Sequence, residues 1–385
     1  MKVPKSFFYF FAFIFFLFAL AFMDYFSVTM AKEDGSSRFW FIRSQLALDL
    51  TCLLTIVMFF CLKLRGIHII CMLWILIMPF IMYLNGSPFT DIIQTILWPL
   101  LFEASYICCQ NGMQRCFFLK KEFMVLAFIG AVYFLLTRVN VDHQTNTIYF
   151  VTLTMPWLLF KSKKKAEIIL LAIFIIFVLL SLKRSMMLSM VLFFSFYFLF
   201  GMKSRKSRIY TIVFSIVLIA GVYVAYDKVD EKMGGLLTDR VTKEETDTGI
   251  GREAVWAMTI NMIQTSPPDK LILGHGHFGV KKNSLLDISA HNDFLEVIYD
   301  YGLIIFSLYL CLWGYVIRRS YQLYRLRSQL FLPYAATLSF FITMSIVSHL
   351  ILYTSYFNYL VMFWGMTEAI IETERKVAAK NKLLS

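Results

Sequence analysis

The sequence predicts an all-α polytopic membrane protein, and three observations support this fold class. Hydrophobic residues make up 59% of the 385 residues, and only 16% are charged. A soluble globular protein is about 45–50% apolar and about 25% charged, so this composition excludes an ordinary soluble enzyme or a disordered chain. The apolar residues fall in long runs, and the 37 basic residues are distributed unevenly between those runs.

Twelve apolar runs reach the length needed to cross a bilayer, which is about 20 residues. They lie at about residues 7–28, 45–62, 66–86, 89–110, 122–138, 144–160, 166–182, 185–201, 209–226, 292–317, 330–351 and 353–371. The first run follows two lysines, as the apolar core of a signal peptide does. It is longer than the roughly 7–15 residues of such a core, so we expect a retained helix.

The basic residues predict the orientation. With the N-terminus inside, 23 of them lie on the cytoplasmic side, 6 lie in short outer segments and 8 lie in one long outer loop. Short cytoplasmic segments of membrane proteins carry an excess of Lys and Arg, so both termini are expected in the cytoplasm. The net charge of +12 is then explained by topology, and nucleic-acid binding loses its support.

The expected organisation is spans one to nine over residues 1–226, an external catalytic loop at 227–291, spans ten to twelve over 292–371, and a cytoplasmic tail at 372–385. Within the loop, residues 251–265 are expected to form a helix. Trp256, Ile260 and Ile263 have the spacing of an apolar helix face, and two prolines end the segment. A short buried run at 271–273 is expected to follow.

Two arginines are candidates for binding an anion on the outer side. Arg184 lies in a tight hairpin at 182–185, where basic residues are disfavoured unless they have a partner or simply reach the lipid headgroups. Arg252 begins the loop helix, where its planar fork and the helix N-terminus favour a phosphate. A surface ion pair of Arg252 with Glu253 or Glu245 is the simpler alternative.

His291 begins span ten at its outer end, where the positive end of the helix favours a neutral imidazole that accepts a proton. Ser289 or Asn292 is the expected N-cap. An interfacial histidine without a chemical role is the alternative. Glu296 and Asp300 follow one turn apart on one face of the same helix. Carboxylates that deep in a span indicate either a catalytic role or pairing with an arginine.

The Gly-rich segment 274–279 has two interpretations. Gly274 and Gly276 could cradle a phosphate, or the segment could be a tight turn with His275 and His277 in solvent. The spacing of these histidines and His291 does not match a helical metal site, so no metal ligands are predicted. The chain contains no phosphate-binding loop of the G-x-x-x-x-G-K-[ST] type and no Asp-x-Asp motif.

Together these motifs resemble the bacterial O-antigen polymerase and O-antigen ligase superfamily. The resemblance is carried, in order, by Arg184, Gly251-Arg252-x-x-x-Trp256, Leu273-Gly274-x-Gly276, Ala290-His291-Asn292-Asp293-Phe294-Leu295-Glu296 and Gly302. It is strongest over residues 249–305. The chain departs from the family around Arg184, where Lys183-Arg184-Ser185 stands in place of the frequent Ser-Arg-Gly.

The resemblance implies a glycosyltransferase C-type membrane enzyme that needs no metal or cofactor. Its donor and acceptor would be glycans linked to undecaprenyl diphosphate. Arg184 and Arg252, with Gly274 and Gly276, would bind the diphosphate, and His291 would act at the acceptor hydroxyl, with Glu296 as a second catalytic candidate. The supporting candidates are Trp256, Asn292, Asp293 and Arg138.

The residues in the G-R-x-x-x-W and A-H-N-D-F-L-E motifs resemble the polymerase branch more closely, which favours a polymerase of lipid-linked oligosaccharide repeats for O-antigen or capsule. An O-antigen ligase, which transfers polymer to lipid A-core, is the first alternative. A flippase or exporter of lipid-linked sugars is the alternative from another class, although the late loop breaks the symmetry expected of a transporter. The expected location is the bacterial inner membrane with the site facing outward. Membrane lipids and a chain-length-regulating co-polymerase are the further expected partners.

Overall fold

The computed structural model describes residues 66–110, 113–139, 148–181, 183–201, 209, 251–285, 287–351 and 354–384. These residues form α-helices and one π-helical turn, without a strand among them. The predicted fold class, an all-α polytopic membrane protein, is confirmed.

The helices of the bundle coincide with the predicted apolar runs. They are α3 (Ile67–Leu84), α4 (Phe89–Cys109), α5 (Met113–Val139), α6 (Ile148–Leu159), α7 (Lys164–Leu180), α8 (Arg184–Phe196) with the π-helical turn η1 (Tyr197–Gly201), α14 (Asp293–Arg325), α15 (Phe331–Val347) and α16 (Thr354–Leu384). The predicted runs at 7–28 and 45–62 lie outside the described residues, as does 209–226 apart from Ile209.

Three described helices are long and apolar enough on their own to cross a membrane: 67–84, 91–109 and 293–325. Shorter apolar helices cover 169–180, 184–200 and 331–347. Helix α5 begins nine residues before the predicted run, and α16 continues as one helix through the predicted tail.

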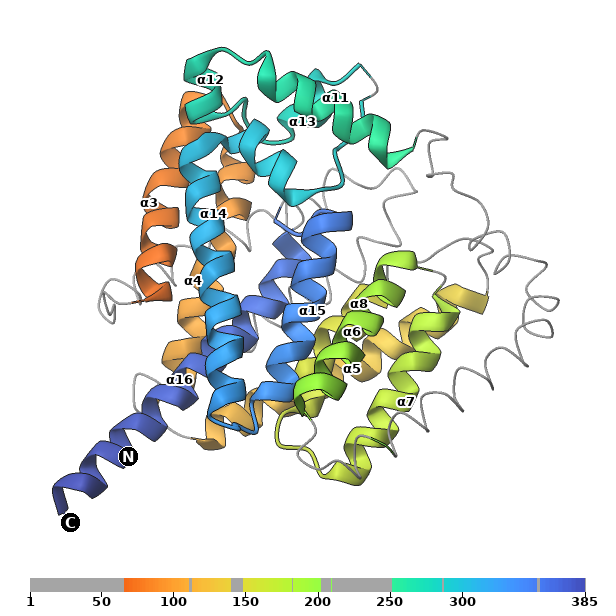
Figure 1. Cartoon of the computed structure of the whole chain (residues 1–385), viewed down its shortest axis with the longest axis vertical. Coiled ribbons are helices and arrows are strands. Elements are labelled where there is room, and N and C mark those ends of the chain that lie inside the picture. The colour runs from red at the N-terminus through yellow and green to blue at the C-terminus, as the bar shows by residue number, and fades with distance from the viewer. Residues whose placement is uncertain are drawn as a thin grey trace.

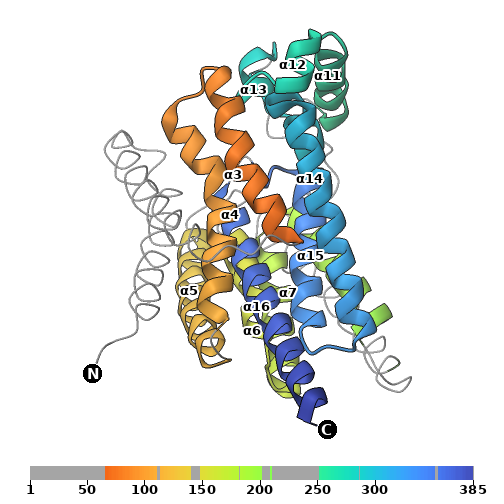
Figure 2. The ribbon, with the colours of Figure 1, turned by 90° about the vertical axis from the view of Figure 1, so that its left-hand side faces the viewer.

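The two ends of the bundle differ (Figure 1). Three short helices, α11 (Arg252–Gln264), α12 (Pro268–Leu273) and α13 (Gly279–Asn283), cover one end, which we call the loop end. The last turns of α16 project from the opposite end, which we call the tail end. Figure 2 shows α3 and α14 running side by side between the two ends.

Aromatic side chains fix the helices that carry the loop end. In the core, Trp98 of α4 packs on Phe357 of α16 with ring centroids 5.2 Å apart, and Trp364 of α16 packs on Phe341 of α15 at 5.3 Å. Trp313 of α14 contacts the same Phe341 at 4.5 Å. Helices α14 and α15 are therefore held together, which places the start of one beside the end of the other.

A break in α14 attaches the loop helices to the bundle. Gly302 has a positive φ of 76°, which frees the carbonyl groups one turn earlier from the helix ladder. The carbonyl of Tyr299 accepts from the His275 N–H at 3.0 Å, and that of Asp300 accepts from the Gly276 N–H at 2.8 Å. The Gly-rich segment is thus bonded directly to the kinked helix.

Replacing Gly302 with alanine is expected to destabilise the protein by at least about 2 kcal/mol, because strained backbone and overpacking add. A Cβ atom at this position would lie 2.2 Å from the carbonyl oxygen of Ile272. Gly314 lies on the same helix with no atom within 4 Å of the corresponding position. Gly314→Ala should be neutral or stabilising, since alanine favours helix. Thermal unfolding of the purified variants measures both, and equal unfolding temperatures would contradict this role of Gly302.

The loop helices correct two expectations. The predicted helix at 251–265 is present as α11, but its buried residues are Val255 and Thr259, whereas Ile260 is exposed. The predicted buried run at 271–273 is wrong: it belongs to α12, which buries no side chain, and Ile272 is exposed. Both errors share a cause, since these short helices cap the end of the bundle and bury only a narrow strip.

Candidate functional site

The start of α14 places His291 at the loop end. Asn292 is the N-cap, as expected, and its side chain accepts hydrogen bonds from the N–H groups of Phe294 and Leu295. His291 precedes the cap with a φ of 53°, a conformation that few non-glycine residues adopt. Backbone strain of this kind is concentrated at functional sites.

Glu296 holds the histidine region together from one turn inside the helix. Its Oε1 atom accepts the backbone N–H of His291 at 3.1 Å and lies 3.2 Å from Nδ1 of His349. The rings of His291 and His349 are 4.3 Å apart between centroids. We call His291, Glu296 and His349 the His291 cluster. Glu296 is completely buried.

Asp293 fixes the segment that carries His349. Its Oδ1 atom accepts from the N–H groups of Leu350 and Ile351, at 2.9 and 3.3 Å. Its other oxygen accepts from the Tyr309 hydroxyl at 3.1 Å. The turn after α15 is therefore tied to the first turn of α14, and Asp293 has a positioning role.

Helix α11 covers the His291 cluster. The indole N–H of Trp256 donates to the carbonyl of Ala290 at 2.9 Å, directly before His291. Arg252, the first residue of α11, is exposed, and its charge acts on the His349 imidazole. Arg252 and Trp256 lie one turn apart on α11. The G-R-x-x-x-W pattern thus brings a cation close to the segment that carries His291.

Arg184 lies at the same end of the bundle as the cluster. It is the exposed first residue of α8, and α7 and α8 form the hairpin that the sequence predicts. The next residue, Ser185, contacts the Tyr149 hydroxyl at 3.2 Å, and the Tyr149 ring packs on Tyr356 at 5.0 Å. Tyr356 lies in the first turn of α16, five residues after Ile351. Arg138 is located near the end of α5.

The backbone of the Gly-rich segment is bonded to the neighbouring helices. The N–H groups of Gly274 and Gly276 already donate to carbonyl groups, of Lys270 and Asp300 respectively, which favours a structural function over a free phosphate cradle. A Cβ atom at Gly274 would lie 2.3 Å from the Asp300 carbonyl oxygen, so only glycine permits this close approach.

The expectation that the two histidines of this segment lie in solvent is wrong. His277 is 1% exposed and its Nδ1 atom lies 2.5 Å from the Tyr301 hydroxyl. Burial, assisted by the charge of Lys282, lowers the pKa of His277 to about 4. His275 is half-buried, stacks on Tyr299 at 4.1 Å and contacts Ser266 at 3.0 Å. Both imidazoles hold the loop against α14.

His349 is the residue that the sequence reasoning missed. It lies within the predicted run at 330–351, which masked its significance. A signal was available, however, because alternation of the spans places the end of that run on the same side as His291. Within the described residues, no group of three His, Cys, Asp or Glu side chains is arranged to hold a metal ion.

The contacts described above bring two imidazoles, a buried carboxyl group and a cation together at the loop end. The His349–Glu296 contact fixes the orientation of one imidazole, and the ring of the half-buried His291 packs beside it. Arg252, exposed at the start of α11, adds a positive charge near His349.

No curated protein matches the chain. Residues 169–310 match the sequence model of the O-antigen ligase family. The matched region runs from α7 through α8, the loop helices and the first half of α14, so it contains both candidate arginines and His291. This match supports the resemblance to the O-antigen polymerase and ligase superfamily of membrane enzymes over those residues.

Proposed function

We propose that this protein is a membrane glycosyltransferase that polymerises oligosaccharide repeats linked to undecaprenyl diphosphate. The observation that carries the proposal is the His291 cluster at the loop end, with Arg252 at its edge and Arg184 at the same end of the bundle. A base with two cations at the same end of the bundle suits a reaction that removes a proton from one partner and releases an anion from the other.

The reaction that fits these groups is a displacement at a sugar carbon. The acceptor hydroxyl oxygen attacks the anomeric carbon of the donor glycan, and the bond from that carbon to the diphosphate oxygen breaks. His291 takes the hydroxyl proton, and the two arginines stabilise the departing diphosphate with their planar forks. The donor bond is already activated, so no cofactor or metal is needed.

Glu296 and His349 are assigned as positioning residues. The carboxylate of Glu296 accepts the His291 backbone N–H and orients His349, whose ring packs on His291. Glu296 therefore helps to fix the direction in which the His291 imidazole points. This positioning matters because a one-ångström displacement of a catalytic group can cost about 10²-fold in rate.

The length of the glycans made by a deletion strain tests the function. A polymerase predicts that the strain carries a single repeat on its lipid A-core. Bare core with full-length polymer retained on the carrier lipid would indicate the ligase instead. Repeats trapped inside the cell, without transfer of any kind, would indicate a flippase. Either of the last two results contradicts the polymerase proposal.

The proposed orientation places the loop end outside the inner membrane. Lys281 in α13 and Lys163, directly before α7, are both exposed, and they lie on opposite sides in this topology. With a membrane-impermeant thiol reagent on intact cells, Lys281→Cys should be labelled above the wild-type background and Lys163→Cys should not. Labelling of Lys163→Cys alone would reverse the topology and contradict the proposal. Membrane lysis, which exposes both positions, is the control.

A further inference from the structure

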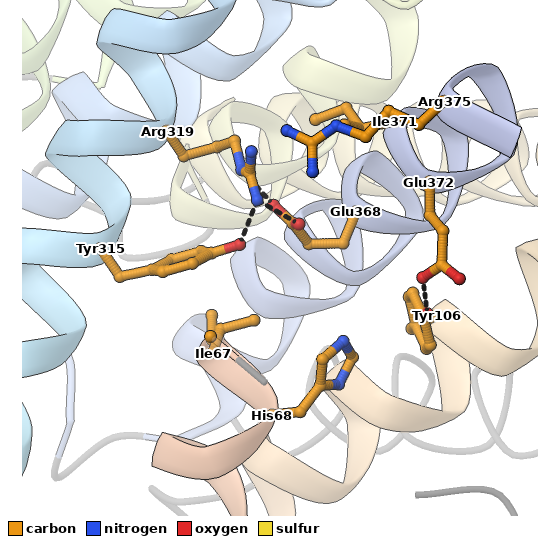
Figure 3. A pocket seen from close by; sticks show the side chains of 10 residues that line it. Ile67, His68, Tyr106, Tyr315, Arg319, Glu368, Ile371, Glu372 and Arg375 are labelled. Carbon is orange, nitrogen blue, oxygen red and sulfur yellow. Dashed lines mark hydrogen bonds and ion pairs between the residues drawn. The ribbon is translucent and has the colours of Figure 1, made fainter. Parts of the chain in front are cut away.

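The tail end contains a cavity lined by charged residues (Figure 3). Two adjoining hollows have volumes of about 170 and 230 Å³, and both are lined by Gly66, Tyr315, Arg319 and Arg375. The lining comes from α3, α4, α14 and α16. At about 30 Å³ for each water molecule, either hollow has room for a phosphate group.

The carboxylates of this cavity are already neutralised by cations. Glu368 receives two hydrogen bonds of 2.5 Å from the Nε and Nη2 atoms of Arg319. Glu372 lies 3.0 Å from the Lys376 ammonium and accepts from the Tyr106 hydroxyl. Figure 3 shows the Arg319 and Glu368 pair on one wall, with Tyr106 and Glu372 on another.

Two arginines remain without a carboxylate. Among the described residues, no Asp or Glu lies within ion-pair distance of Arg318 or Arg375, although both line the cavity. The wall therefore carries two positive charges that no carboxylate among the described residues balances. An anion with several oxygen atoms is the complement to two guanidinium groups.

Other polar groups face the same space. His68 is buried, and its Nδ1 atom is 2.7 Å from Glu103, so Nε2 is the ring nitrogen left for the cavity (Figure 3). Helix α3 begins at Ile67 without a side-chain cap. Buried charged pairs of this kind often stabilise a protein less than apolar residues of the same size do. Ionisable residues within a membrane bundle indicate a functional site.

We propose that the tail-end cavity binds a phosphate group, supplied by an anionic phospholipid of the adjacent leaflet or by a soluble phosphate. The lining residues belong to the last turns of α4 and α14, the first turn of α3 and the part of α16 near the predicted end of its span. This is the depth of the lipid headgroups, where basic pockets between helices bind anionic lipids. The proposal does not depend on the glycosyl transfer proposed above.

Native mass spectrometry of the purified full-length protein tests the site. The probes are phosphatidylglycerol, phosphatidylcholine and inorganic phosphate, each titrated separately. We expect phosphatidylglycerol to bind at least about tenfold more tightly than phosphatidylcholine, since each charge-assisted contact is worth about a factor of ten. The double variant Arg318→Gln, Arg375→Gln should lose this preference.

The matched control is Arg325→Gln, Arg327→Gln, which removes the same charge from exposed positions outside the cavity. It should keep the preference, and the unfolding temperatures should show that both double variants are folded. If inorganic phosphate binds and the cavity variant abolishes its binding, the site takes soluble phosphate, which also supports the proposal. Equal affinities of wild type and cavity variant for every probe, or equal losses in both double variants, would overturn it.

Discussion

Replacement of His291 with alanine should lower the rate of transfer by about 10²–10⁴-fold, the usual contribution of a general base. The protein should still insert and bind the lipid-linked donor, because the arginines assigned to the diphosphate remain. Glu296→Gln should show a smaller loss, since the amide still accepts the His291 N–H but orients His349 less strongly. Rates measured with purified variants at saturating donor separate these effects from binding.

His275→Ala is the matched control for this prediction. His275 is half-buried in the same loop, but it stacks on Tyr299 and lies outside the His291 cluster. Its loss should lower the unfolding temperature, whereas the folded variant should transfer sugar at close to the wild-type rate. If His291→Ala transfers sugar at nearly the rate of wild type, another group removes the proton, and His349 becomes the first candidate.

Replacing Arg184 or Arg252 with lysine should weaken function although the charge is kept. A lysine ammonium cannot form the two parallel hydrogen bonds of a guanidinium to a diphosphate. The loss of one charge-assisted hydrogen bond is expected to reduce the rate by about tenfold to a hundredfold. Both side chains are exposed, so the fold should not change. The measurement is the amount of polymer at equal protein level.

Arg325→Lys, at the tail end, provides the comparison for these two variants. It makes the same chemical change at an exposed position remote from the loop end and should leave polymer production at the wild-type level. Full polymer production by both Arg184→Lys and Arg252→Lys would show that neither arginine binds the donor through its fork.

The bundle was predictable because a membrane imposes a simple rule on sequence. An apolar run of about 20 residues can satisfy its backbone in lipid only as a helix, so run length alone locates α3, α4, α14 and their neighbours. The loop helix α11 followed from its bounding glycine and prolines. Its buried face did not, because it is decided by contacts with α14 at the end of the bundle.

The candidate site was predictable only where its residues are close in sequence. His291, Asn292, Asp293 and Glu296 lie within two turns of one helix, and the cap could be read directly. His349 joins them through a contact between residues 53 positions apart, which no local pattern reveals. The backbone contacts of Gly274 and Gly276 were not predictable either, because they depend on the break in α14 at Gly302.

The central claim is that the His291 cluster carries out metal-free sugar transfer, and its most direct test is an assay of the purified wild-type protein. The protein would be incubated with undecaprenyl-diphosphate-linked repeats in the presence of a metal chelator, and the products separated by size. Our account predicts a ladder of lengthening glycans on the carrier lipid, which His291→Ala removes. Loss of the wild-type ladder on chelation, or an unchanged ladder with His291→Ala, would contradict it.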